Sequence, residues 1–333
     1  MSTSLIVLIP AGLLAIVGLL CFAGCTLDKT GLPGGPFTQY TGKTILPTPS
    51  IIAYWPLGET ADTQPAAELI SGNTGNYIDP LMAPALYPWP LIPVPNPGGP
   101  DIPSAAATGM ISFTQPGLVK GDAVQPGNDP AVITPCVVVN GCYVEVLFNT
   151  KFIPQSAFTI EAWVRPDWDS GATHGNRFVL DSRDINPGTG FALFAKVEDD
   201  LSANYRWAGM IGNGGAGADG FSIVTTVEGT IPLGSTEPTY LALTYDGMTL
   251  TLFVDGQSRG TVTPPTPYMP NSTQPLWIGA AAPYVPRRPQ PAGVVGSPLF
   301  PFVGAIQDVA IYSAALGPDT ILLHFHNGQG SAS

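Results

Sequence analysis

Charged residues are scarce in this chain of 333 residues, and basic residues are the scarcest. Lys and Arg number 12 against 24 Asp and Glu, so charged residues make up only 11% of the sequence and the formal net charge is -12 at pH 7. A surface of this sign repels phosphate backbones and anionic lipid headgroups. We therefore expect no nucleic-acid partner.

The spacings that catalytic sites require are also missing. The sequence has no G-x-S-x-G segment, and two of its three histidines, His324 and His326, lie two residues apart near the C-terminus, where they would face different sides of a helix and could not share a metal ion. Retaining glycosidases need two carboxylates about 5 Å apart, whereas Glu161 is the only acid on its predicted strand. We expect the protein not to be an enzyme.

Cysteine is rare, and its four residues form two pairs. Cys21 and Cys25 lie in the apolar N-terminal stretch, whereas Cys136 and Cys142 bracket the segment VVVNG, whose Asn-Gly dipeptide is a turn signal that can bring the two sulfur atoms together. We interpret Cys136 and Cys142 as a disulfide, and two buried thiols are the alternative. The disulfide would place the domain outside the cytoplasm.

The apolar stretch from Leu5 to Cys25 contains no charged residue. A helix of this length, at ~1.5 Å per residue, crosses a hydrocarbon layer of ~30 Å. The end of the stretch, Phe22 to Cys25, also resembles a bacterial lipobox, which would make Cys25 a lipidated first residue. Because no Lys or Arg precedes the stretch, as a secretion signal normally requires, we favour a retained helix that contacts membrane lipid through residues 5–25.

The remaining chain is long enough for one large β-domain. We expect an anchor over residues 1–27, a Pro/Gly-rich linker over residues 28–50 and a domain over residues 51–330 on the periplasmic or cell-surface side of the membrane. A proline-rich insertion over residues 79–104 interrupts the domain, because proline at that density excludes a ladder strand.

The most regular pattern is AFTIEAWVRPDW, from Ala157 to Trp168. Apolar residues occupy every second position from Phe158 to Val164, they alternate with a more polar set, and Pro166 ends the run. A period of two residues predicts a strand with two different faces.

Two later segments are equally regular. YLALTYDGMTLTLFVDGQSRGTV, which ends at Val262, predicts a hairpin whose Asp246-Gly247 and Asp255-Gly256 pairs supply left-handed turn positions. FVGAIQDVAIYSAALGPDTILLHFHNG predicts a closing strand from Ile306 to Tyr312 and then a short helix that begins near Pro318.

These motifs, in this order, resemble the laminin G-like, concanavalin A-like jelly-roll modules of bacterial surface proteins. The resemblance extends from Ile51 to Gly328 and rests on F-T-I-E-A-W-V-x-P, on the TYDG…LFVDG hairpin and on the closing strand, where Gln307 replaces a common acid. It implies an all-β, two-sheet jelly-roll sandwich with one short C-terminal helix, preceded here by the transmembrane helix. It implies little about activity, because such a fold hosts many functions.

The resemblance also implies a candidate calcium site. Modules of this family often hold one Ca²⁺ at the sheet rim through an acid near the first turn, the carbonyls of that turn and an acid of the closing strand, which is an all-oxygen shell. In this chain Glu68, the Ser71–Asn73 turn with Asn73 itself, and Asp308 fall at those positions. The alternative is that Glu68 is a surface residue and Asp308 a local hydrogen-bond acceptor.

Aromatic residues suggest two binding surfaces. Trp163, Trp168, Trp207 and Trp277 could stack on glycan rings, although their places in alternating strands make packing the commoner outcome. In the proline-rich insertion, an apolar arm either packs on the edge of the sandwich or contacts a partner protein. The arm residues with the strongest interface character are Tyr87, Trp89, Leu91 and Ile92.

Two functions are consistent with these features. The first is a non-enzymatic, membrane-anchored structural subunit whose domain docks on protein subunits of a larger membrane assembly. The second is a surface adhesion or glycan-binding module. The sequence identifies neither the assembly nor the glycan.

Overall fold

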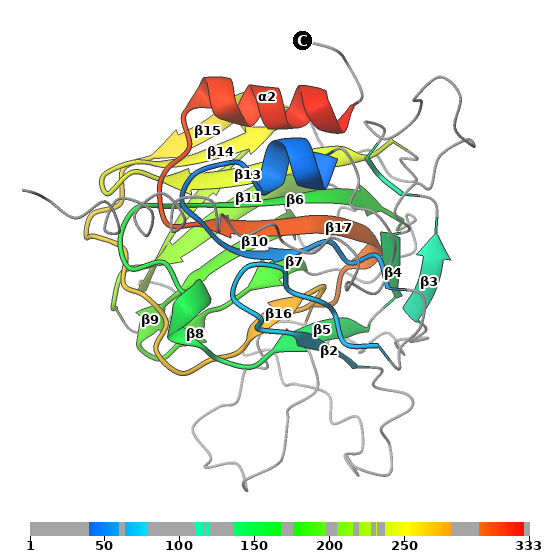
Figure 1. Ribbon diagram of the computed structural model, residues 1–333. Coiled ribbons are helices and arrows are strands. Elements are labelled where there is room, and N and C mark those ends of the chain that lie inside the picture. The colour runs from blue at the N-terminus through cyan, green and yellow to red at the C-terminus, as the bar shows by residue number, and fades with distance from the viewer. Residues whose placement is uncertain are drawn as a thin grey trace, which may run out of the picture. The chain divides into compact units, whose positions relative to one another are not determined.

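The computed structural model describes residues 40–59, 64–78, 111–115, 117–119, 136–140, 142–167, 176–197, 205–215, 220–227, 231, 237–281 and 300–329. All of these residues belong to one unit, Thr38–Ser333. They form two large antiparallel sheets, a two-stranded hairpin and one α-helix near the C-terminus (Figure 1). This arrangement confirms the expected all-β sandwich and fits a jelly roll.

The larger sheet, sheet A, has eight strands in the order β15-β14-β13-β6-β17-β4-β3, and β1 pairs with β17 beside β4. β6, which has the most regular alternation in the sequence, lies in the interior of this sheet. The strands are β1 (Ile51–Trp55), β3 (Ile111–Gln115), β4 (Cys136–Asn140), β6 (Phe158–Pro166), β13 (Thr239–Tyr245), β14 (Leu250–Val254), β15 (Gln257–Val262) and β17 (Val303–Tyr312).

The smaller sheet, sheet B, has seven strands in the order β12-β11-β10-β7-β16-β5-β2. They are β2 (Gly75–Ile78), β5 (Tyr143–Val146), β7 (Arg177–Asp181), β10 (Phe191–Val197), β11 (Tyr205–Gly212), β12 (Phe221–Thr225) and β16 (Leu276–Ile278). The other elements are the hairpin of β8 (Asp184–Ile185) and β9 (Gly188–Thr189), the π-helical turn η1 (Thr41–Ile45), the 3-10 turn η2 (Thr150–Phe152) and the helix α2 (Pro318–Gly328).

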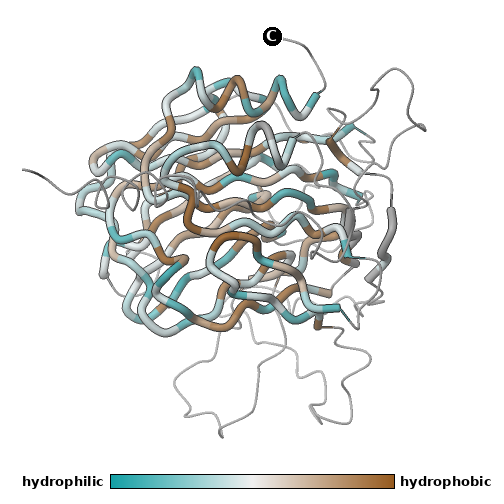
Figure 2. Tube along the Cα trace, viewed as in Figure 1, coloured by the Kyte–Doolittle hydropathy of each residue, from teal (hydrophilic) through white to brown (hydrophobic). Residues whose placement is uncertain are grey.

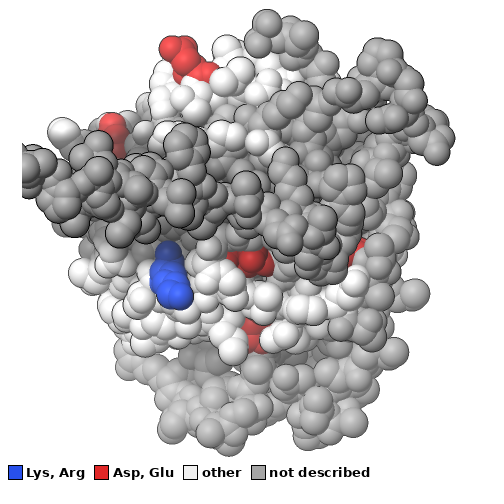
Figure 3. Space-filling view, viewed as in Figure 1, with Lys and Arg blue, Asp and Glu red and all other residues white. Residues whose placement is uncertain are grey.

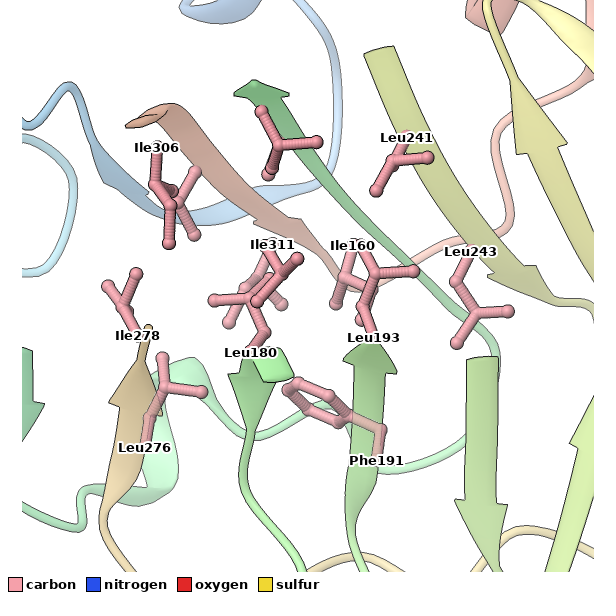
Figure 4. Packing of buried hydrophobic residues seen from close by; sticks show 14 of the residues in the cluster. Ile160, Leu180, Phe191, Leu193, Leu241, Leu243, Leu276, Ile278, Ile306 and Ile311 are labelled. Atoms are coloured by element: carbon pink, nitrogen blue, oxygen red, sulfur yellow. The ribbon is translucent and has the colours of Figure 1, made fainter. Parts of the chain in front are cut away.

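The core lies between the two sheets, and hydropathy alternates along their strands (Figure 2). Aliphatic side chains of sheet A meet those of sheet B face to face (Figure 4). Side chains of a strand point alternately to its two faces. The apolar residues at every second position of the sequence therefore fill this layer. The labelled contacts come from Ile160, Leu241, Leu243, Ile306 and Ile311 of sheet A and from Leu180, Phe191, Leu193, Leu276 and Ile278 of sheet B.

Two local features fix the register of sheet A. The turn between β14 and β15 has positive φ at both Asp255 (51°) and Gly256 (74°), as the sequence predicted for this hairpin. In β17, the register shifts between Gln307 and Ala310, and Asp308 within this bulge has a φ of 54°. At that point the neighbour of β17 changes from β4 to β1.

The domain begins earlier than we expected. Residues 40–50, which we assigned to the linker, pack on the outer face of sheet A beside α2 (Figure 1). Tyr40 and Ile45 are 1% and 0% exposed, and the Asn327 side chain of α2 donates to the Thr44 hydroxyl over 2.9 Å. The sequence did not indicate that this segment packs on the sheet, because the segment is mostly polar and its few apolar residues are spaced around one helical turn. We call residues 40–50 the strap.

The strap and α2 cover the second face of β6. Its outward-facing residues Glu161 and Trp163 are 0% exposed, and Phe325 of α2 stacks on Trp163 with a ring separation of 6.0 Å. Gly328 lies so close to the Trp163 ring that a Cβ there would stand 2.2 Å from it. The helix therefore needs glycine at this point of contact.

The carboxylate of Glu161 is buried in this layer and is satisfied by three side chains. The hydroxyl of Tyr240 donates to Oε2, the hydroxyl of Tyr312 donates to Oε1 over 2.8 Å, and Nδ1 of His324 lies 3.0 Å from Oε2. Burial, and after it the charge of Glu161, raises the pKa of both tyrosines well above their usual range, so both hydroxyls stay protonated donors.

His324 extends this network to the strap. Its Nε2 lies 3.0 Å from Oγ1 of Thr48, and that hydroxyl donates to the carbonyl of Thr44 over 2.6 Å. The chain Glu161, His324, Thr48 has the order of an acid, a base and a hydroxyl, but the hydroxyl proton is directed to the backbone and His324 is 1% exposed. The network therefore joins the strap, β6 and α2, and it does not form an activated nucleophile.

We expect Ile45→Ala to lower the free energy of unfolding by about 2–4 kcal/mol, because it empties a fully buried site under the strap. The matched control is Leu323→Ala on α2, where the side chain is 44% exposed and the expected loss is below about 1 kcal/mol. Urea unfolding of both variants measures the difference. Equal losses would show that the strap contributes no more than a surface residue.

A second variant tests the buried network. His324→Leu leaves the carboxylate of Glu161 without its imidazole partner and should cost about 3 kcal/mol of stability. His326→Leu changes the same residue type two positions along α2, where it is partly exposed, and should cost less than about 1 kcal/mol. Chemical denaturation at neutral pH compares the two. A loss of stability in the His326 variant as large as that in the His324 variant would contradict a stabilising role of the contact between His324 and Glu161.

Candidate functional site

The outer face of sheet B carries a row of polar and aromatic residues that crosses four neighbouring strands. In the strand register, Asn76 of β2 lies opposite Glu145 of β5, Glu145 opposite Trp277 of β16, and Trp277 opposite Asp181 of β7. Neighbouring strands are ~4.8 Å apart, so the row is roughly 14 Å long. A row of this length spans two or three sugar rings.

Alternation along β5 and β16 places this row outside the sandwich. Val144 and Val146 of β5 and Ile278 of β16 belong to the core between the sheets, whereas Trp277 packs in a separate cluster with Tyr143 and Ala280. Trp277 and Tyr143 are each 3% exposed, so they are buried side chains next to the partly exposed Glu145.

Glu145 is the unusual member of the row. It is partly buried, and burial raises the pKa of its carboxyl above the ordinary value of 4.5. Among the residues that the structure describes, no hydrogen bond or ion pair engages this carboxylate, and its neighbour Asn76 is exposed. Dehydration without a compensating partner is unfavourable, and residues of this kind are enriched at functional sites.

The far end of the row is a neutral ion pair. The guanidinium of Arg183 binds Asp181 with two hydrogen bonds, Nε to Oδ1 at 2.7 Å and Nη2 to Oδ2 at 2.8 Å. It also lies 4.5 Å from the ring centre of Phe178 and 5.7 Å from that of Phe221. Its remaining amino group, Nη1, donates to the sulfur of Met210. The guanidinium of Arg183 thus lies against residues of β7, β11 and β12.

The tryptophans that we considered as a sugar platform are divided among different layers. Trp163 is covered by α2, and Trp207, which is 5% exposed, packs in the core between the sheets. Trp277 alone of those within the described residues faces the outside of sheet B. Trp168 lies outside the described residues. Trp163, Trp207 and Trp277 are all buried by packing, as alternation favoured.

Glu68 is a buried structural acceptor and not the surface residue of our alternative interpretation. Its Oε1 accepts from the backbone N–H of Tyr54 and Ile70, and its Oε2 accepts from the N–H of Ser71, the Ser71 hydroxyl and the N–H of Asn73, at 2.6–3.1 Å. The side chain thereby replaces a neighbouring strand at the edge of β1. Five donors already occupy the oxygens that would bind Ca²⁺.

The structure does not bring Asp308 to the same point. Asp308 accepts a hydrogen bond from the hydroxyl of Tyr54, whereas Glu68 binds the backbone N–H of that tyrosine. Asn73 is held near Glu68, and its Oδ1 accepts from Asn149 over 2.7 Å. The described residues contain no cluster of three or more acidic, histidine or cysteine side chains suited to a metal. Calcium binding by Glu68, Asn73 and Asp308 stays a prediction.

The expected disulfide is not tested by the structure. Cys142 is buried, but the side chain of Cys136 lies outside what the structure describes. The strands on either side of Asn140-Gly141 do not pair with each other, since β4 belongs to sheet A and β5 to sheet B. The pairing of Cys136 with Cys142 stays a prediction.

Several expectations fall outside the described residues. They concern the membrane segment 5–25, the lipidation alternative at Cys25 and the arm residues Tyr87, Trp89, Leu91 and Ile92. Within the part of the chain that is described, no helix has the length and hydropathy to cross a membrane. Docking on a membrane assembly therefore stays a prediction.

Sequence reasoning missed Glu145, Asp181 and Arg183. A signal was present in the segment YVEV, where one acid interrupts a β-branched run at a position that alternation assigns to an outer face. Nothing in the segment itself says whether this acid meets a partner. Among the described residues on the face seen in Figure 3, charged side chains are sparse, in keeping with the composition.

Comparison with solved structures gives distant similarities. Domain 4 of AbnA, an extracellular arabinanase from Geobacillus stearothermophilus solved with arabinotriose, is 16% identical, with 65% of this chain and 87% of that chain covered and a TM-score of 0.40. The CBM40 of the Ruminococcus gnavus IT-sialidase, bound to α2,3-sialyllactose, is 14% identical over 51% of this chain and 83% of that chain, with a TM-score of 0.36.

A heptameric SAP-like pentraxin from Limulus polyphemus is 14% identical, with 64% and 79% covered and a TM-score of 0.37. No curated protein matches the chain. The laminin G family model described as the concanavalin A-like lectin/glucanases superfamily matches residues 140–322. That match includes β6, the β14–β15 hairpin, β17 and the start of α2. Because it covers more than half of the sequence, the chain belongs to the concanavalin A-like lectin/glucanase superfamily.

Proposed function

We propose that the protein is a carbohydrate-binding module that receives a saccharide on the outer face of sheet B, at the end of the row where Asn76 is exposed and Glu145 is partly exposed. The observation that carries the proposal is the carboxylate of Glu145, partly dehydrated and without a partner among the described residues. A sugar presents adjacent hydroxyl donors, and two of them can satisfy such a carboxylate at once.

The surroundings of Glu145 suit the same ligand. The exposed amide of Asn76 supplies both a donor and an acceptor one strand away, while Trp277 and Tyr143 are buried at 3% exposure. Sugar-binding sites contain a few directed polar groups of this kind. Membership of a superfamily named for lectins and glucanases makes a saccharide the natural class of ligand to test first.

Binding without hydrolysis is part of the proposal. A retaining glycosidase needs two carboxylates about 5 Å apart. On this face Asp181 is bound to Arg183, and two strand spacings of ~4.8 Å separate it from Glu145. The acid of the central strand, Glu161, is 0% exposed beneath α2. These positions support a binding module and give no support to a glucanase.

The direct test is a screen of the purified protein against a glycan panel, followed by calorimetry on the strongest ligand. Glu145→Gln should weaken binding about tenfold or more, because a hydrogen bond to a charged group contributes about 1.5–3 kcal/mol. Asn76→Ala should weaken it less. Asp319→Asn on α2 removes an equal charge from the opposite side of the sandwich and should leave the affinity unchanged. An unchanged affinity of the Glu145 variant, or the absence of any glycan ligand, would refute the proposal.

Glu145 should also reduce the stability of the unliganded protein. Its pKa is raised in the fold, so the folded state favours the protonated acid, and stability is lost as the pH rises above the ordinary value of 4.5 and through the raised pKa of the folded state. Glu145→Gln should therefore raise the Tm at neutral pH, and the gain should vanish below about pH 4. Thermal unfolding of the wild type and the variant at neutral pH and below about pH 4 measures this gain in Tm. A gain of equal size at the two pH values would mean that the charge of Glu145 is not its cause.

A further inference from the structure

We infer that the imidazole of His324 is doubly protonated and positively charged in the fold, and that this charge makes the closure of the strap sensitive to pH. The inference does not depend on saccharide binding, because it concerns the covered face of sheet A. It follows from the direction of each hydrogen bond that the two ring nitrogens make.

The strap side of the ring fixes the first proton. Oγ1 of Thr48 lies 2.6 Å from the carbonyl oxygen of Thr44 and 3.0 Å from Nε2 of His324. A carbonyl has no proton to donate, so the single hydroxyl proton of Thr48 fills the shorter contact, the one to Thr44. Thr48 can then only accept from the imidazole. Nε2 of His324 therefore carries a proton.

The other side of the ring faces a group that also only accepts. Nδ1 of His324 lies 3.0 Å from Oε2 and 3.2 Å from Oε1 of Glu161. The same two oxygens accept the hydroxyl protons of Tyr240 and Tyr312. Two such donors stabilise an ionised carboxylate, which has no proton of its own to give to Nδ1. Nδ1 therefore carries the second proton, and the ring is an imidazolium.

Each element packed around α2 brings a titratable group to this layer. Among the described side chains, these groups are Tyr40 of the strap, Glu161 of β6, Tyr240 of β13, Arg259 of β15, and Asp308 and Tyr312 of β17. Burial raises the pKa of the three tyrosines well above its usual range, so they stay neutral. Asp308 accepts from the hydroxyl of Tyr54, and Arg259 is exposed. The imidazolium thus meets its counter-charge at Glu161.

The proton on Nδ1 links the closure of the strap to pH. Without it, a ring lone pair would face the carboxylate, and the contact that orients His324 toward Thr48 would become repulsive. A histidine of the unfolded chain loses its proton near pH 6.5. Above that pH the unfolded chain binds one proton fewer than the fold, so stability falls as the pH rises until the ring deprotonates in the fold. Below about pH 6.5 the contribution of the pair is complete.

The direct test is nitrogen NMR of the intact protein with isotope-labelled histidine at about pH 7.5, where a free histidine is mainly neutral. We expect two protonated ring nitrogens at His324. The signals are assigned by their loss in His324→Gln. A ring of His324 with one protonated and one bare nitrogen overturns the inference, and this measurement requires only the wild type to be folded.

Urea unfolding between about pH 6 and pH 9 tests the consequence. Relative to His324→Gln, the unfolding equilibrium constant of the wild type should grow by up to about tenfold per pH unit above about pH 6.5, because one proton separates the two states. His326→Gln removes the other histidine of α2 and should keep the wild-type dependence. Parallel pH profiles of the wild type and His324→Gln would overturn the inference.

The strap itself is followed by hydrogen exchange of the Leu46 backbone N–H, which donates to the carbonyl of Thr41 over 3.0 Å. Comparison of the wild type with His324→Gln at each pH removes the intrinsic effect of pH on exchange. The protection of Leu46 in the wild type relative to the variant should decline as the pH rises from about 6 to about 9. A ratio that stays constant over this range would show that the charge of His324 does not control the strap.

Discussion

The central strand carries a carboxylate that water cannot reach, and much of the outer layer of sheet A is arranged around it. Glu161 is fully buried on β6, and its donors come from β13, β17 and α2. An isolated buried charge would be very costly, so the carboxylate is tolerated only when all three donors are in place. Strands adjacent in the sheet and a helix from the end of the chain thus depend on one another through a single side chain.

The same constraint explains the strap. His324 has two ring nitrogens, and the one directed away from Glu161 finds the hydroxyl of Thr48. Residues that lead into the first strand are thereby tied to the last helix, and Asn327 adds a second link to Thr44. The two ends of the described domain close over the same face, which leaves that face unsuited to binding a ligand.

Sheet B has a different outer face. Its polar groups differ in burial and pairing: Asp181 is 0% exposed and is matched by Arg183, Asn76 is exposed, and Glu145 has no partner among the described residues. The partly dehydrated Glu145 lowers the stability of the fold, in a protein that has few charged residues. Residues that lower the stability of a fold are common where they serve binding instead of folding.

The sequence by itself determined the strands and the family of the fold. Alternation in β6, the left-handed turn at Asp255-Gly256 and the closing strand before α2 are local patterns, and local patterns specify faces and turns without reference to the rest of the chain. Only the tertiary structure decided what each outer face contacts. Period two distinguishes the two sides of a strand, but it cannot say that the side bearing Glu161 and Trp163 lies beneath a helix from residues 318–328, or that Glu145 meets no cation among the described residues. These outcomes depend on contacts between segments more than a hundred residues apart, such as Glu161 with His324, and no spacing within one segment encodes them.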